Sequence, residues 1–267
     1  MRLTRPPYSG PTSTHAEIYA QTHADVLKCL SLFFFKHTQP SPETIDRILA
    51  TIYGQCIGDA IGLLTEFLSK DEAKMHYGKV AKELEYRHKQ IVCDFHRSRW
   101  QEGDWTDDSD QMILIMRSLI DWGDDVTKNA RDFAKTTHYD PRCQASTVAV
   151  SVAIATMLQG KHKDKKDNFK VKEIIQDAYE YASTYLKLDE ADKIGYTYKS
   201  MGTGFWALKQ DNVRKTITKI MMQGGDVDSN ACVGGALLLC KLGLSALPES
   251  WLTKLLHKNW LDNEIKK

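Results

Sequence analysis

Helical periodicity from residue 45 to the end of the chain is the feature that most constrains the fold. Apolar residues fall on one helical face over residues 45–56, an Ala/Val-rich buried helix is expected over 148–158, and an amphipathic one over 171–186. No run alternates apolar and polar residues between hairpin turns, which is the pattern of a half-buried strand. The sequence therefore predicts an all-α protein, folded as an orthogonal multi-helix bundle.

One domain is expected over residues 41–267, after an extension of unassigned role at residues 1–40. Ser41 followed by Pro42 is typical of a helix start, with Ser41 as the cap. The 267 residues, 42% of them hydrophobic, can bury one sizeable core. Within the extension, Phe33, Phe34 and Phe35 are expected to pack on the domain rather than to form an exposed partner site, because large exposed apolar patches are rare.

Charge and cysteine usage point to a soluble protein that binds a small ligand. The formal net charge is +1, so no global field favours nucleic acid or an acidic membrane. The apolar run at residues 29–35 is too short to span a bilayer. Six cysteines without a CxxC pair indicate reduced thiols, hence a cytoplasmic location, with the nucleus as the alternative. A monomer is the favoured oligomeric state.

A first acidic cluster lies in Gly103-Asp-Trp-Thr-Asp-Asp-Ser-Asp110, directly before an apolar helical stripe. Gly103 permits a tight turn and Thr106 suits an N-cap, which places Asp107 and Asp108 in the first turn, where the helix dipole favours carboxylates. The sequence thus predicts a buried helix that begins with a dense patch of oxygen ligands.

A second cluster, Gly224-Gly-Asp-Val-Asp-Ser-Asn230, has the same plan. Its two glycines supply the turn, Asp226 and Asp228 can aim at one point, and Ser229 adds a hydroxyl. The helix that follows is built of small residues, which let another backbone come close, so we expect it deep in the fold.

Together the clusters predict one site for a hard cation. Oxygen donors without His or Cys suit Mg²⁺, Mn²⁺ or Ca²⁺, and carboxylates crowded together repel unless a cation neutralises them. The alternative is that each cluster is only an acidic cap on its own helix. Two clusters with paired carboxylates and a hydroxyl favour the metal.

Three motifs in order resemble the signatures of the ADP-ribosylglycohydrolase family. They are Gln55-Cys-Ile-Gly-Asp-Ala-Ile-Gly-Leu-Leu-Thr-Glu66, Gly103-Asp-Trp-Thr-Asp-Asp108 and Gly224-Gly-Asp-Val-Asp-Ser-Asn-Ala231. The resemblance spans roughly residue 45 to the C-terminus. It implies hydrolysis of the glycosidic bond of ADP-ribose, in an ADP-ribosylated protein or a small ADP-ribose derivative. It also implies two Mg²⁺ ions, whose ligands would be Thr106, Asp107, Asp108, Asp226, Asp228 and Ser229.

The same resemblance extends to residues around the metal. Asp107, Asp108, Asp228 and Glu66 are the candidate catalytic carboxylates, and Glu66 would also contact substrate at the entrance of the site. From the sequence alone Glu66 is equally well a solvated residue after a helix that ends with Gly62 as its C-cap. The resemblance makes His138 a candidate substrate contact, against the alternative of a cap or core histidine.

A few further residues are weaker candidates. Arg142 could pair with a phosphate, and Trp105, Phe205 and Trp206 could stack on an adenine, although aromatic residues are more often core. The family also has a long segment, with a loop that wraps ribose and phosphates, where this chain has only residues 121–137. This departure suggests an internal deletion. It leaves two alternatives open: an enzyme that lacks part of its substrate cradle, or a catalytically silent relative with a binding or structural, crystallin-like role.

Overall fold

The protein is all-α, as the sequence predicts. The computed structural model describes residues 40–89, 91–122, 130–132, 134–135, 141–183 and 196–266. Within these residues no strand is formed, and Lys163 and Phe169 make one isolated antiparallel bridge. Residues 33–35 and His138 lie outside the described residues, and so does most of the shortened segment at 121–137.

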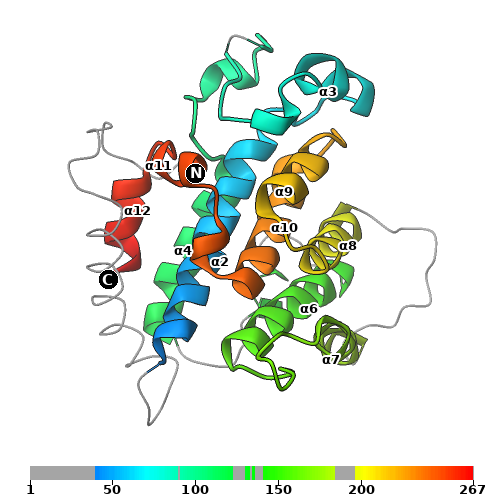
Figure 1. Cartoon of the computed structure of the whole chain (residues 1–267), viewed down its shortest axis with the longest axis vertical. Helices are drawn as coiled ribbons and strands as arrows, with labels where there is room; N and C mark the ends of the chain where they lie inside the picture. Colours follow the sequence, from blue (N-terminus) through cyan, green and yellow to red (C-terminus); the bar gives the residue numbers. More distant parts are fainter. Residues whose placement is uncertain are drawn as a thin grey trace.

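The helices of the described residues cross one another at varied angles (Figure 1). In chain order they are α2 (Pro42–Gly62), α3 (Lys70–Tyr77), η1 (Ala81–Glu83), η2 (Arg97–Arg99), α4 (Asp107–Trp122), α6 (Pro141–Leu158), α7 (Val171–Ser183), α8 (Tyr196–Leu208), α9 (Val213–Met221), α10 (Val227–Leu242), η4 (Leu244–Ala246), α11 (Glu249–Thr253) and α12 (Lys258–Ile265).

Helix α2 begins as the sequence indicates. Ser41 is the N-cap and its hydroxyl accepts a hydrogen bond from the Thr44 amide at 3.1 Å, with Pro42 in the first turn. The end of the helix differs from expectation, since Gly62 is still helical and Leu63 is the C-cap. Gly62 is required for another reason, because a Cβ there would lie 2.3 Å from the Cα of Asp228.

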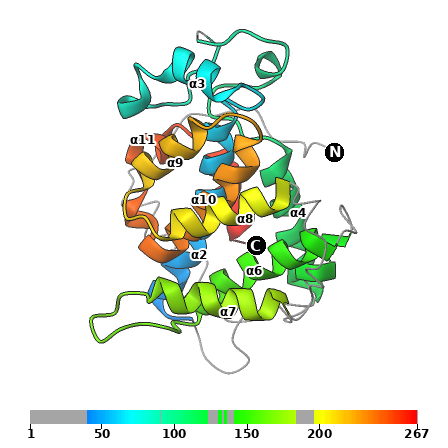
Figure 2. The same ribbon diagram turned by 90° about the vertical axis from the view of Figure 1, so that its right-hand side faces the viewer.

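The centre of the bundle is the pair α2 and α10, which lie side by side in both views (Figures 1 and 2). Their backbones touch along a row of small residues one helical turn apart on α2. A Cβ on Gly54 would lie 2.4 Å from the carbonyl oxygen of Gly235, and one on Gly58 would lie 2.1 Å from that of Ala231. The expectation that the small-residue helix lies deep in the fold and admits a close backbone is confirmed. This contact brings the C-terminal end of α2 against the start of α10.

This close approach makes Gly58 intolerant of any side chain. We expect Gly58→Ala to lower the free energy of unfolding by about 3 kcal/mol, because the two helices must separate to admit a methyl group. Gly202→Ala is the matched control: Gly202 is also helical, but a Cβ there meets nothing within 4 Å. The control should leave stability unchanged or raise it by up to about 1 kcal/mol through helix propensity. Urea unfolding of both variants measures the contrast, and equal effects would contradict the packing account.

Helices α6, α7 and α8 form a second apolar layer against α10 (Figure 2). The predicted helix over 148–158 is the buried C-terminal part of α6, and the one over 171–186 is observed as α7, described as far as Ser183. Beyond α2 the chain forms a cap with α3, η1 and η2 at the upper end of the molecule in Figure 1. This cap carries residues that the site uses.

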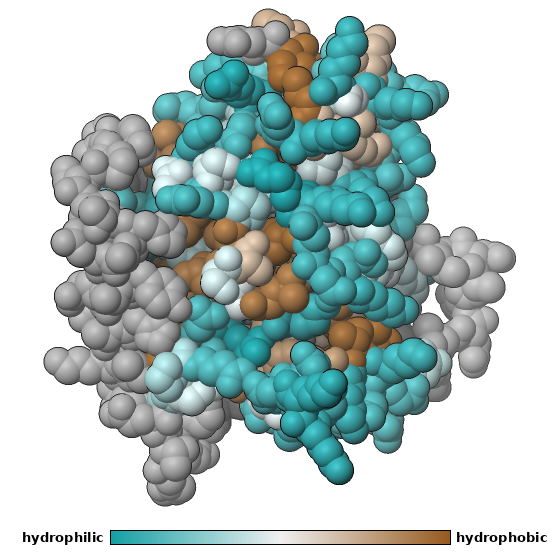
Figure 3. All heavy atoms as spheres, in the orientation of Figure 1, coloured by the Kyte–Doolittle hydropathy of each residue, from teal (hydrophilic) through white to brown (hydrophobic). Residues whose placement is uncertain are grey.

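The described surface in the view of Figure 3 is mainly hydrophilic, with hydrophobic side chains in small groups. None of the helices in the described ranges is both long and apolar enough to cross a membrane.

Candidate active site

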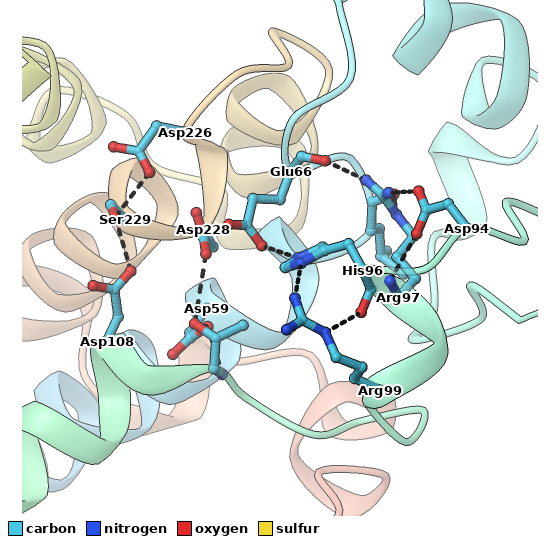
Figure 4. Close-up of polar contacts among 12 residues, drawn as sticks. Asp59, Glu66, Asp94, His96, Arg97, Arg99, Asp108, Asp226, Asp228 and Ser229 are labelled. Atoms are coloured by element: carbon cyan, nitrogen blue, oxygen red, sulfur yellow. Dashed lines mark hydrogen bonds and ion pairs between the residues drawn. The ribbon is translucent and has the colours of Figure 1, made fainter. Parts of the chain in front are cut away.

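The two acidic clusters meet at the N-terminal ends of α4 and α10 (Figure 4). The hydroxyl of Ser229 lies 2.8 Å from a carboxylate oxygen of Asp108 and 3.1 Å from one of Asp226. Gly103, Gly224 and Gly225 all have positive φ, at 83°, 68° and 76°, so the turns before the two helices need glycine as expected. Residues some 120 positions apart in the chain thus share one site.

Asp59, on the last turn of α2, fixes the start of α4. Its fully buried carboxylate accepts hydrogen bonds from the amide and hydroxyl of Thr106, at 2.9 and 2.8 Å, and from those of Ser109, at 3.0 and 2.7 Å. Asp59, a residue of another helix, therefore performs the N-capping role for α4 that the sequence suggests for Thr106. Burial, together with the charge of Asp108, raises the pKa of Asp59 to about 7.

Asp228, in the first turn of α10, is a buried carboxylate without adequate partners. One of its oxygens has no hydrogen-bond partner, and the other lies 3.5 Å from the Thr106 hydroxyl, whose single proton is closer to Asp59. Burial raises the pKa of Asp228 well above its ordinary range, and the charges of Glu66, Asp108 and Asp59 raise it further. Such a group is stable as an anion only beside a positive charge.

The oxygen ligands of the two acidic clusters fit a hard cation, although they do not surround a single point. Among the described residues no three His, Cys, Asp or Glu side chains are arranged as a finished metal site. Asp108 is held by Ser229, while Asp107 is exposed and accepts a hydrogen bond from Gln111 at 3.4 Å. The orphaned oxygen of Asp228 and the mutual repulsion of the carboxylates are the features that a bound cation would relieve.

Glu66 lies beside this group and not in solvent, which removes the alternative of a solvated helix end. It is 6% exposed, and its carboxylate raises the pKa of Asp228, so the two are close. In Figure 4 its side chain lies between Asp228 and His96. The contact with His96, 2.5 Å between Nε2 and Oε2, was not anticipated from the sequence.

Of the aromatic candidates, Trp105 is excluded as a base-stacking residue. It is fully buried and packs against His257 and Trp260, with ring centroids 5.6 and 6.4 Å away. Its indole donates a hydrogen bond to Asp110 at 3.0 Å, so it anchors the loop before α4 to the core. Phe205 is part of the apolar layer of α6–α8, and Trp206 is 38% exposed on α8. Arg142 lies half-buried near the start of α6.

The crowded carboxylates predict an unusual pH dependence of stability. Burial is the main cause that raises the pKa of Asp59 to about 7 and that of Asp108 to about 6, against an ordinary value of 3.8. The folded chain then binds more protons than the unfolded one above pH 4, so these groups reduce stability as pH rises towards 7. Without metal, wild type should lose stability relative to Asp108→Asn between about pH 4 and pH 7, as measured by thermal unfolding. A difference that is independent of pH would contradict these shifts.

The architecture and the site together define a class: an all-α bundle with acidic residues at the starts of two helices that meet at its centre. The family model described as ADP-ribosylglycohydrolase matches residues 40–127 and 122–267. The chain therefore belongs to the ADP-ribosylglycohydrolase family, as the three motifs suggested.

Individual relatives agree with this assignment. ADP-ribosylarginine hydrolase Tri1 of Serratia proteamaculans (strain 568) is 22% identical over 305 residues, which covers 84% of this chain and 79% of the relative. A solved structure titled ADP-ribosylglycohydrolase-related protein complex superposes with a TM-score of 0.55 at 18% identity, covering 85% of this chain and 98% of that one. The structural likeness supports the fold.

Proposed function

We propose that this chain hydrolyses the glycosidic bond between ADP-ribose and an acceptor, in an ADP-ribosylated protein or a small ADP-ribose derivative, and that it requires Mg²⁺. The observation that carries the proposal is Asp228: a buried carboxylate with an unpartnered oxygen, among three other carboxylates that raise its pKa. A fold would not keep so costly a group for packing alone, since burying an unpaired charge is strongly unfavourable.

Two Mg²⁺ ions would be held by Thr106, Asp107, Asp108, Asp226, Asp228 and Ser229. When bound, Mg²⁺ supplies positive charge for oxygen atoms of the ribose and of the attacking water. The likeness to Tri1, named an ADP-ribosylarginine hydrolase, supports the substrate class.

The residues of the chain have distinct roles in this proposal. The bond breaks through an oxocarbenium-like state, so water must arrive beside the anomeric carbon and lose a proton. Glu66 would accept that proton, and its burial beside Asp228 supports this role. Asp59 touches neither substrate nor water in this scheme; it holds Thr106 and the first turn of α4 in position.

A catalytically silent role is the second candidate, and two observations favour it. The alignment with Tri1 spans 305 residues, more than the 267 of this chain, so that relative carries residues without a counterpart here. The family model matches in two parts that overlap at residues 122–127, within the segment at 121–137 that is inferred to be shortened. Loss of part of the substrate cradle would reduce catalysis, which depends on positioning.

The two candidates differ in turnover. Purified full-length chain should release free ADP-ribose from ADP-ribosylated arginine or serine peptides in the presence of Mg²⁺ and lose that activity in excess chelator. Absence of release from both peptides and from small ADP-ribose conjugates, by a chain shown to be folded, would exclude the hydrolase and leave the silent role.

A further inference from the structure

The segment around η2 forms hydrogen bonds with both the side chain and the main chain of Glu66 (Figure 4). His96 contacts the carboxylate through Nε2, and the buried guanidinium of Arg97 donates to the carbonyl oxygens of Glu66 and, at 2.9 Å, of Leu64. Arg97 is itself held by the carboxylate of Asp94. Asp94, His96 and Arg97 lie outside the three motifs that carry the family resemblance.

The protonation of His96 can be deduced from its second nitrogen. Arg99 Nη2 lies 3.0 Å from His96 Nδ1. A guanidinium can only donate hydrogen bonds, so Nδ1 must accept and cannot carry a proton. The proton of the neutral imidazole is then on Nε2, where it points at Glu66 Oε2 at 2.5 Å. The two hydrogen bonds therefore run in one direction: Arg99 donates to His96, and His96 donates to the Glu66 carboxylate.

The neighbouring backbone fixes the other side of Glu66. The Phe67 amide donates to the Gly225 carbonyl at 2.8 Å, and the Gly225 amide donates to the Leu68 carbonyl at the same distance. Phe67 has a φ of 61°, which is unusual for a residue with a bulky side chain, and its ring lies edge-on to His96 at 4.9 Å. The residue after Glu66 is thus tied to the turn of the second acidic cluster.

We propose that His96, held in its Nε2–H tautomer by Arg99, is a positioning residue that holds the Glu66 carboxylate in place beside Asp228. The role rests on the proposed function, in which Glu66 accepts the proton of the attacking water. Because Glu66 is flanked by other carboxylates, it needs a donor on its far side to stay at the site. His96 supplies that donor without adding a competing positive charge.

Steady-state kinetics of two substitutions test this role. His96→Leu removes the donor and should lower kcat about 100-fold with KM changed less than about 3-fold, because positioning acts on the chemical step. His96→Gln places an amide N–H near the position of Nε2 and should recover most of the lost kcat. Thermal unfolding confirms that both variants fold. A His96→Leu variant with wild-type kcat would overturn the inference while the proposed function stands.

The tautomer of His96 can be tested without an activity assay. Long-range ¹H–¹⁵N NMR spectra of the full chain should show His96 as a neutral imidazole protonated at Nε2, and Arg99→Met should remove this preference. Arg87→Met makes the same change at an exposed arginine of the same cap and should leave the His96 signals unchanged. A proton on Nδ1 in the wild type would overturn the positioning geometry. A wild-type chain with the expected tautomer but no hydrolysis would instead overturn the proposed function, and the catalytic role of His96 with it.

Discussion

Asp228→Asn is expected to reduce hydrolysis by at least about 10³-fold and to weaken Mg²⁺ binding while the chain stays folded. Asp228 is the most perturbed carboxylate of the site: buried, with one unpartnered oxygen, and close to Glu66, Asp108 and Asp59. Asparagine has the same shape as aspartate but lacks the negative charge that binds a cation. The same removal relieves repulsion among the remaining carboxylates, so metal-free stability should be unchanged or higher.

Three measurements on one preparation separate these effects: release of ADP-ribose, calorimetric titration with Mg²⁺, and urea unfolding without metal. Asp71→Asn is the matched control, since Asp71 is an exposed residue in the first turn of α3 and its loss removes the same charge. The control should retain activity and metal binding. If Asp228→Asn kept full Mg²⁺ binding and hydrolysis, the site assignment would be wrong.

Asp59→Asn, the same chemical change on the last turn of α2, should have the opposite effect on stability. We expect it to lower the free energy of unfolding by about 3 kcal/mol at pH 8 without metal. All four donors that meet the Asp59 carboxylate, from Thr106 and Ser109, need an acceptor. An amide group offers one oxygen and turns its N–H₂ against two of those donors, which leaves buried polar groups unsatisfied.

Urea unfolding of Asp59→Asn beside Asp228→Asn gives the sharpest comparison, because both substitutions remove one charge from neighbouring buried carboxylates. The first should destabilise and the second should not. Equal losses of stability would mean that burial alone, and not hydrogen bonding to α4, determines how much each carboxylate contributes to the free energy of unfolding.

Much of the fold was predictable because its signals are local. The Ser41-Pro42 start of α2 needs only a cap and a first-turn proline, and the glycines at 103, 224 and 225 need only a turn with positive φ. The small residues after Asp228 predicted a close helix contact, which the structure supplies through Gly54 and Gly58 of α2. The meeting of the two acidic clusters followed from their matched plan and the family resemblance.

The rest could not be predicted because it depends on contacts between distant segments. Asp59 appeared in the sequence analysis only as part of the first motif, because its four donors lie 47 to 50 residues further along the chain. One signal was present: an aspartate among Ile57, Gly58, Ala60 and Ile61 on an apolar helix must be buried with partners. The hydrogen bonds of His96 and Arg97 to Glu66 could not be predicted in this way, because η2 is a three-residue turn without sequence periodicity.

Two alternatives that the sequence left open were decided by packing. Trp105 is a core residue, the role expected more often for an aromatic side chain, and does not stack on a base. Gly62 is not the C-cap of α2 but allows close contact with α10. In both cases the sequence shows the residue type that a role permits, and only the packing shows which role is used.

Calorimetric titration of the full chain with ADP-ribose, in the presence and absence of Mg²⁺, tests the central claim most directly. If the carboxylates gathered around Asp228 form a metal-dependent ADP-ribose site, binding should be measurable with Mg²⁺ and should fall at least about 10-fold without it. Failure of the folded chain to bind either Mg²⁺ or ADP-ribose would contradict the account.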